Sequence, residues 1–322
     1  MQRRVSAANH VPTIDEVTVT TEYELLTESA GLVDRSGRGK LLLRGSEAAE
    51  FLQGQVTNDV EGLEPGEGCY AALLTHKGKL RADMRVLRGE EWIWLDTEPD
   101  ALEVLEQTAR MYGIGRDVQF EDVTATRAIL SLIGPAARER LDIAPPEDEH
   151  SFHEGEHGLY VSTHLGVDVI CDASAATAVR AALGVEDASE DAAECLRVEA
   201  GRPRLGFDMG GDTLPEEAGI NERAVSFTKG CYVGQETVAR LHYRGKPNRH
   251  LRGLRLSAPV ERGAEVTLDE RTIGTIGSVC TSPRVGEIAL AILRREAEPG
   301  QPVLVGDAEV DAEVAELPFT AT

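Results

Sequence analysis

Blocks of alternating or periodic apolar residues run from about residue 23 to the end of the chain. The clearest block covers residues 80–87, where every second residue is apolar. This period of two predicts a β-strand with one buried and one polar face. The two faces would be Ala82, Met84 and Val86 on the buried side, and Arg81, Asp83 and Arg85 on the other.

Similar patterns predict a series of strands and helices before residue 244. Strands are expected over residues 40–44, 68–75, 92–95, 127–133, 159–165 and 167–171. Helices, with apolar residues three to four positions apart, are expected over 23–33, 46–56, 99–112, 135–141, 172–183, 189–200 and 233–241. Residues 1–20 are polar, and we expect them to be loosely held.

The pattern changes near residue 242. The segment 242–248 contains Gly245 and Pro247 and is typical of a linker. After it, short strand patterns separated by glycine turns cover residues 251–256, 265–268, 271–278, 288–293, 302–305 and 308–316. These strands predict a small all-β barrel or sandwich.

The charge of the chain narrows the class of protein. Its 322 residues are typical of about two domains, and 56 acidic against 33 basic residues give a formal net charge of −23. Lysine is nearly absent, with five in the whole chain. This is typical of a cytoplasmic protein adapted to molar salt, where a Debye length of roughly 3 Å screens repulsion between carboxylates. A role in binding basic partners is less favoured because the acid is spread along the chain, and a nucleic-acid partner is not expected.

Neither a membrane span nor a metal site is predicted. No apolar run reaches about 18 residues, and residues 1–10 lack an apolar signal core, so we expect a cytoplasmic location. The cysteines are odd in number, scattered and never spaced as C-x-x-C, which indicates a reducing compartment and no zinc or iron–sulfur ligand set. They are Cys69, Cys171, Cys195, Cys231 and Cys280.

Candidate chemistry concentrates at residues 227–236, with the sequence F-T-K-G-C-Y-V-G-Q-E. Cys231 would lie just ahead of the helix expected from residue 233 and beside Lys229, and both neighbours would favour the thiolate. The alternative is that Cys231 is a small buried apolar residue in a glycine loop. The loop before this stretch, residues 205–220, is too long for a plain connection and is expected to be functional.

Two other features carry titratable groups. Glu199 falls at an inward position of the helix expected over 189–200, and an unpaired buried carboxylate costs several kcal/mol. It would therefore be exposed, held for a ligand, or paired with an arginine such as Arg202, which the spacing alone favours. Three histidines lie in the acidic loop 145–158, which we interpret as solvated because a metal site needs fixed geometry. They are His150, His153 and His157.

The octet 229–236 resembles the signature K-G-C-Y-[hydrophobic]-G-Q-E of the YgfZ-type folate-binding proteins, relatives of the aminomethyltransferase (T-protein) of the glycine cleavage system. Three further segments resemble the same family, namely F-L-Q-G-Q-V-T-N-D-V at 51–60, K-G-K-L-R-A-D at 77–83 and L-R-V-E-A-G at 196–201. The resemblance runs in the family's order from about residue 25 to 320. T-proteins lack the K-G-C-Y start, so Cys231 separates the two branches.

The resemblance implies an α+β fold, with a T-protein-like folate-binding α/β region around a central cavity and a C-terminal all-β barrel domain. The implied domains are a flexible segment 1–22, a folate-binding domain 23–244 made of two α/β subdomains, and a barrel domain 245–322. The implied cofactor is tetrahydrofolate or a one-carbon-substituted form.

The resemblance also implies residues of a folate site. Glu199 would grip the pterin, because one carboxylate can accept two hydrogen bonds from an aminopyrimidinone. Asp83 would lie near the folate nitrogen that accepts the one-carbon unit. Its alternative is a solvated ion cluster with Arg81 and Arg85. Asn58 would line the cavity.

The signature octet completes the expected site. Cys231 and Lys229 would act in catalysis together with Asp83, with Lys229 helping to keep the thiol ionised. Tyr232 is expected to contact the cofactor.

Three functions follow from the resemblance. The first, which the K-G-C-Y start favours, is a tetrahydrofolate-dependent factor that supports assembly or repair of iron–sulfur client enzymes through a reactive Cys231. The second is an aminomethyltransferase that takes a one-carbon unit from a lipoyl carrier protein to tetrahydrofolate, with Asp83 stabilising charge at the leaving amine. The third is a folate-sensing module without chemistry, in which Cys231 is buried and unreactive.

Overall fold

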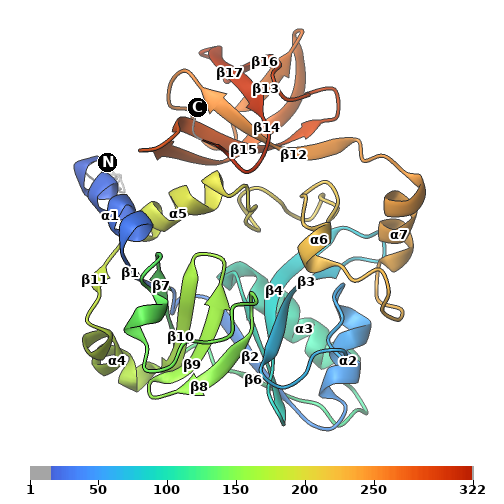
Figure 1. Cartoon of the computed structure of the whole chain (residues 1–322). Coiled ribbons are helices and arrows are strands. Elements are labelled where there is room, and N and C mark those ends of the chain that lie inside the picture. The colour runs from blue at the N-terminus through green and yellow to red at the C-terminus, as the bar shows by residue number, and fades with distance from the viewer. Residues whose placement is uncertain (1–15, 321–322) are drawn as a thin grey trace, which may run out of the picture.

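The computed structural model describes residues 16–320, which form two α/β units side by side below a β-barrel (Figure 1). The first helix, α1 (Glu16–Glu28), begins earlier than the pattern indicated and ends before β1 (Gly31–Asp34). The expected helix over 23–33 is therefore wrong in its last residues, which form a buried strand. Residues 1–15 of the segment expected to be flexible lie outside the described residues.

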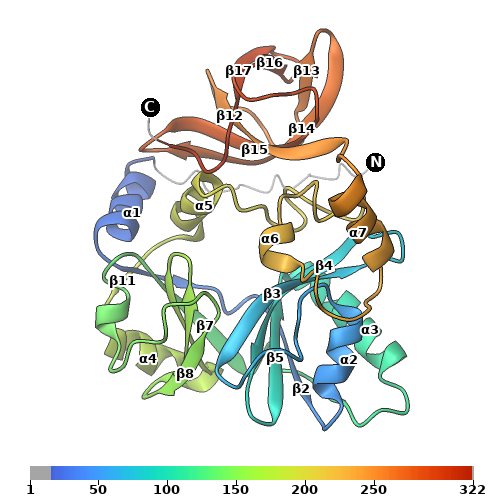
Figure 2. The same ribbon diagram turned by 45° about the vertical axis from the view of Figure 1, so that its right-hand side comes forward.

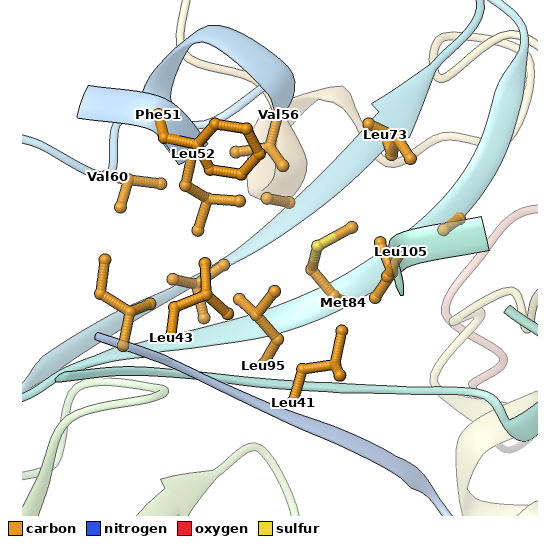
Figure 3. Close-up of a cluster of buried hydrophobic side chains, with 14 of the residues drawn as sticks. Leu41, Leu43, Phe51, Leu52, Val56, Val60, Leu73, Met84, Leu95 and Leu105 are labelled. Atoms are coloured by element: carbon orange, nitrogen blue, oxygen red, sulfur yellow. The ribbon is translucent and has the colours of Figure 1, made fainter. Parts of the chain in front are cut away.

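One α/β unit is a five-stranded antiparallel sheet with strand order β3-β4-β5-β2-β6. Its elements are β2 (Gly39–Arg44), α2 (Ala48–Gln55), β3 (Glu67–Leu74), β4 (Leu80–Arg88), β5 (Trp92–Thr97), η1 (Pro99–Ala101), α3 (Leu102–Tyr112) and β6 (Gln119–Asp122). The apolar face of β4 packs under α2 and α3 in a core that includes Met84, Phe51 and Leu105 (Figure 3). The predicted alternation along 80–87 is confirmed, and it leaves Asp83 on the opposite face from this core.

The other unit is a six-stranded sheet with strand order β11-β1-β7-β10-β9-β8. Besides β1, its elements are β7 (Arg127–Ile133), η2 (Arg138–Arg140), β8 (Phe152–Gly155), β9 (Gly158–Thr163), β10 (Gly166–Asp172), η3 (Ala173–Ala175), α4 (Ala176–Leu183) and β11 (Glu186–Asp187). The helix expected over 135–141 is reduced to the single turn η2. The N-terminal strand β1 pairs with β7 and β11, so the chain crosses between the two units at its start.

The C-terminal segment forms a closed barrel with strand order β12-β15-β14-β13-β16-β17, which confirms the all-β prediction. Its strands are β12 (Arg249–Leu256), β13 (Glu265–Leu268), β14 (Arg271–Ser282), β15 (Gly286–Arg294), β16 (Pro302–Val305) and β17 (Val310–Ala315). Apolar residues from all six strands fill the interior.

Three helices connect these bodies. They are α5 (Glu190–Glu199), α6 (Asn221–Ala224) and α7 (Gln235–Arg244). The Ser189 hydroxyl accepts a hydrogen bond from Ala192 N at the start of α5, as expected of a helix cap. Figure 2 shows α5 between the barrel above and the two sheets below. Among the described residues, no helix is long and apolar enough to cross a bilayer.

A disulfide joins α5 to the barrel. Cys195 and Cys280 are 85 residues apart in sequence, and their Cα atoms lie 5.4 Å apart. The expectation drawn from the scattered cysteines missed this pair, because spacing along the chain carries no information on contacts between a helix and a distant strand.

Candidate functional site

A cavity of about 440 Å³ lies where the two sheets, α5 and α6 meet. This volume is within the range of sites that hold a drug-sized ligand. Its wall holds eight carboxylates, seven arginines and two histidines. They are Asp34, Asp83, Asp96, Glu98, Glu149, Asp168, Glu190 and Glu194; Arg35, Arg38, Arg85, Arg197, Arg202, Arg204 and Arg223; and His150 and His164.

Most of these charges neutralise one another. The Arg85 guanidinium lies 2.7 Å from Asp96 and 2.6 Å from Asp168, so the ion cluster considered for the polar face of β4 leaves Asp83 out. Arg38 and Arg85 both face Asp96 and hold the pKa of that carboxyl at about 2, against the effect of burial. Paired charges of this kind fix the wall but leave few groups free for a ligand.

Asp83, Tyr70 and Arg223 are the exception. The Tyr70 hydroxyl donates to Asp83 Oδ2 at 2.6 Å, and the Arg223 guanidinium lies over the Tyr70 ring, 4.9 Å from its centroid. Within residues 16–320, neither Asp83 nor Arg223 has an ion-pair partner. Burial raises the pKa of Asp83, and the hydrogen bond from Tyr70 opposes that shift. One acceptor, Asp83, and one cation, Arg223, in the cavity wall are therefore not engaged in ion pairs among the described residues.

Asn58 lies behind this group and does not line the cavity. Its Nδ2 donates to the backbone carbonyls of Tyr70, at 2.9 Å, and of Arg223, at 3.0 Å. The residue expected to touch the cofactor instead holds together the two chain segments that carry Tyr70 and Arg223.

Glu199 also lies outside the cavity wall. It is 3% exposed and accepts hydrogen bonds from Tyr23 Oη, Ser282 Oγ and the Arg284 guanidinium. The arginine partner is thus Arg284 from the barrel, whereas Arg202 binds Glu149 at 2.6 Å. The carboxylate that the resemblance assigns to the pterin ties α1, α5 and the barrel together.

The cavity side of α5 carries a different carboxylate. Five residues correspond to a rotation of about 140° around a helix, so Glu194 and Glu199 face different neighbours. Glu194 lines the cavity and pairs with Arg197, at 2.7 Å, and with Arg204, at 3.3 Å. Because α5 is covered on both sides, its apolar spacing could not show which side faces the ligand.

The Lys229 ammonium, which was expected to keep the Cys231 thiol ionised, is bound to backbone carbonyls. Its side chain is 8% exposed, and Nζ donates to the carbonyls of Gln53, Val56 and Asn58 at 2.6–2.8 Å. These carbonyls lie at the C-terminal end of α2, where a cation is favourable. Burial lowers the pKa of Lys229 to about 8, so the ammonium form still prevails at neutral pH.

Cys231 is exposed and free, and it is not part of the cavity wall. The helix after it begins at Gln235, after Gly234 in the left-handed region (φ 88°), rather than at residue 233. Tyr232 is buried in an apolar cluster with Leu74 and Val238, so it also stands apart from the cavity. The structure therefore separates two candidate centres, the cavity around Asp83 and the surface thiol.

Comparisons with known proteins identify the family of the chain. The family model described as "GCVT N-terminal domain" matches residues 12–154, and that described as "Glycine cleavage T-protein C-terminal barrel domain" matches residues 249–320. A probable aminomethyltransferase from Natronomonas pharaonis is 30% identical over 94% of this chain and 90% of its own length. The chain belongs to the glycine cleavage T-protein family.

Two further relatives show the breadth of this T-protein family. A protein named "tRNA-modifying protein YgfZ" from Colwellia psychrerythraea is 29% identical over 73% of this chain and 76% of its own length. The crystal structure of the glycine cleavage system aminomethyltransferase T from Bartonella henselae superposes with a TM-score of 0.85 over 94% of this chain and 89% of that chain. At 23% identity this likeness shows the shared fold. Proteins named as YgfZ and proteins named as aminomethyltransferases are thus both present among the relatives.

His150 is a cavity residue that the sequence did not identify. Its loop was interpreted as solvated, yet the side chain lines the cavity and Nδ1 is buried without a hydrogen-bond partner among the described residues. Its backbone adopts a φ of 74°, which is strained for a residue other than glycine. Burial, together with Arg85, lowers the pKa of His150 to about 4, so the ring is neutral at pH 7. His153 and His157 do not line the cavity.

Proposed function

We propose that the cavity binds tetrahydrofolate, in its free or a one-carbon-substituted form. The observation that carries this proposal is the unpaired Asp83–Tyr70–Arg223 group in a cavity of ligand size. A carboxylate can accept hydrogen bonds from ring N–H and amino groups, and a guanidinium can bind a carbonyl or carboxylate. Members of the T-protein family use tetrahydrofolate, which supports folate as the ligand class.

We assign this chain to the support of iron–sulfur cluster assembly or repair in client enzymes. The supporting observation is the free, exposed Cys231 in a loop that Lys229 and Tyr232 anchor on either side. A thiol held at the surface is accessible to a protein partner. Because Cys231 does not line the cavity, a ligand bound there would not block this access. A cytoplasmic location and adaptation to high salt remain predictions from the charge.

The alternative function is aminomethyl transfer to tetrahydrofolate from a lipoyl carrier protein. It is favoured by the position of Asp83 in the cavity, where a carboxylate would orient the folate and stabilise positive charge at the leaving amine. In this function Cys231 has no role.

Complementation of a deletion strain separates the two functions. We expect wild-type chain to restore iron–sulfur enzyme activity and Cys231→Ser to fail, with glycine cleavage unaffected by either. If the deletion impairs glycine cleavage alone, and Cys231→Ser restores it while Asp83→Asn does not, the transferase function is correct.

Direct titration with tetrahydrofolate tests the ligand. Asp83→Ala and Arg223→Ala should each weaken binding, because each removes an unpaired polar group from the cavity wall. Glu199→Ala is the matched control, because it removes a carboxylate that lies outside the cavity wall. Equal affinity in wild type, Asp83→Ala and Arg223→Ala would refute this site.

A further inference from the structure

The surface around α7 differs from the rest of this acidic protein. Helix α7 lies at the outer edge of the molecule, beside the turn between β3 and β4 (Figures 1 and 2). Val238 is its buried residue. The helix touches the turn at Gly78, where an added Cβ would lie 3.0 Å from the Thr237 side chain. One side of α7 is therefore packed and the other is open.

Aromatic rings gather at the C-terminal end of α7. The rings of Phe227 and His242 are stacked 3.8 Å apart, and Tyr243 packs edge-on against both. Tyr243 is 66% exposed. Tyrosine exposed beside other aromatic rings is typical of the centre of a protein interface.

Unpaired positive charge lies on α7, just after it, and on the turn beside it. Lys77, Arg240, Arg244 and Lys246 are exposed, and none of their side chains makes an ion pair or hydrogen bond with another described residue. Three of the five lysines of the chain, counting Lys79 in the same turn, fall in this region. We call these four cations and the rings of Phe227, His242 and Tyr243 the α7 surface; Glu236 is the carboxylate within the helix.

The α7 surface adjoins the free thiol. Cys231 follows Phe227 by four residues, at most about 14 Å of chain. Phe227 and Tyr232, on either side of it, belong to the same apolar cluster as Val238 of α7. Any macromolecule seated on the α7 surface would therefore lie next to Cys231.

We propose that the α7 surface is the docking site for an acidic protein partner, which it brings to Cys231. The proposal rests on the proposed function in which Cys231 serves a client protein. Free cations around exposed aromatic residues complement a carboxylate-rich surface and orient its approach, although the net charge of this chain is −23.

Nucleic acid is a poorer fit to the same surface. Bases stack on open ring faces, and the stacked rings of Phe227 and His242 cover one face of each other. Long-range repulsion from an acidic chain is also strongest for a polyanion with a charge every few ångströms.

Photocrosslinking in living cells tests the proposal with the full chain. A benzophenone amino acid is placed at residue 243, and in a matched control at residue 112. Tyr112 is also an exposed tyrosine (51%) at the end of a helix. We expect a nuclease-resistant adduct at residue 243, absent at 112, whose partner is shown by mass spectrometry to be an acidic protein.

Charge reversal provides the second comparison. In the residue-243 background, Arg240→Glu should lower the adduct yield about fivefold, because it replaces an attractive exposed pair by a repulsive one. Arg271→Glu, which changes an exposed barrel arginine in the same way, should leave the yield unchanged. Added salt should lower the wild-type yield.

Several outcomes would overturn the proposal. They are equal adducts at residues 243 and 112, an adduct that nuclease removes, an adduct with a second copy of this chain, or a yield that Arg240→Glu does not change. The proposed function fails separately, when Cys231→Ser restores iron–sulfur enzyme activity while the acidic adduct at residue 243 persists.

Discussion

Replacement of Lys229 by methionine should destabilise the α/β unit that contains α2. The effect should be a loss of stability and not the loss of a catalytic group. The buried ammonium donates to three carbonyls at the end of α2, at 2.6, 2.8 and 2.7 Å. Methionine fills a similar volume but leaves all three acceptors without this donor. At about 1 kcal/mol or more for each unsatisfied acceptor, the free energy of unfolding should fall by about 3–5 kcal/mol.

Urea unfolding followed by tryptophan fluorescence measures this loss. Both tryptophans of the chain, Trp92 and Trp94, lie in β5 of the same sheet, so the signal reports on the unit that Lys229 anchors. Lys246→Met removes an exposed lysine and should change the free energy of unfolding by less than about 0.5 kcal/mol. If Lys229→Met is as stable as Lys246→Met but inactive, the lysine acts on Cys231 and its structural role at the end of α2 is refuted.

Three further predictions concern the cavity wall and the barrel. Tyr70→Phe should raise the pKa of Asp83, because it removes a hydrogen bond to the ionised form; the acid limb of the pH–activity profile should move to higher pH, and an unmoved limb would exclude Asp83 as the titrating group. Reduction of the Cys195–Cys280 disulfide, which closes a loop of 85 residues, should lower the free energy of unfolding by up to about 4.5 kcal/mol. Calorimetry with and without reductant should show this loss of stability in wild type and not in Cys195→Ala. The pKa of His150 is about 4 in the folded protein and 6.5 in the unfolded chain. The free energy of unfolding should therefore fall as pH drops through this window, by up to about 1.4 kcal/mol per pH unit. His150→Gln should flatten this dependence of stability on pH, and equal slopes in wild type and His150→Gln would show that His150 is solvated.

Much of the fold could be predicted from the sequence because it depends on local pattern. The period of two over residues 80–87 identified a strand and separated Asp83 from the core face. The glycine-punctuated strands after residue 248 indicated the barrel. Some shortfalls were at ends of elements, as at Gly31, where residues with a helical pattern pair with a neighbouring strand instead. Others were short elements, since the helix expected over 135–141 is a single turn and β8 lies within the loop interpreted as solvated.

The candidate site was harder to predict because its residues depend on distant partners. Tyr70 and Arg223 are 153 positions apart in the numbering, and no motif joins them, yet they stack in the cavity. His150 gave no signal beyond being a histidine, since its charged loop is typical of solvent-exposed segments. Its burial depends on the other sheet, where β3 lies against the His150 backbone at Gly68.

The sequence by itself therefore determined the family, most of the longer strands and helices, and the position of Asp83 on a polar face. The tertiary structure alone decided which groups meet. In it, Glu199 binds Arg284 of the barrel, Glu194 binds Arg204 in the cavity wall, and the Lys229 ammonium binds a carbonyl at the end of α2. The physical reason is that periodicity encodes which face of an element is buried, whereas the partner of a buried charge is set by whichever distant segment packs against that face.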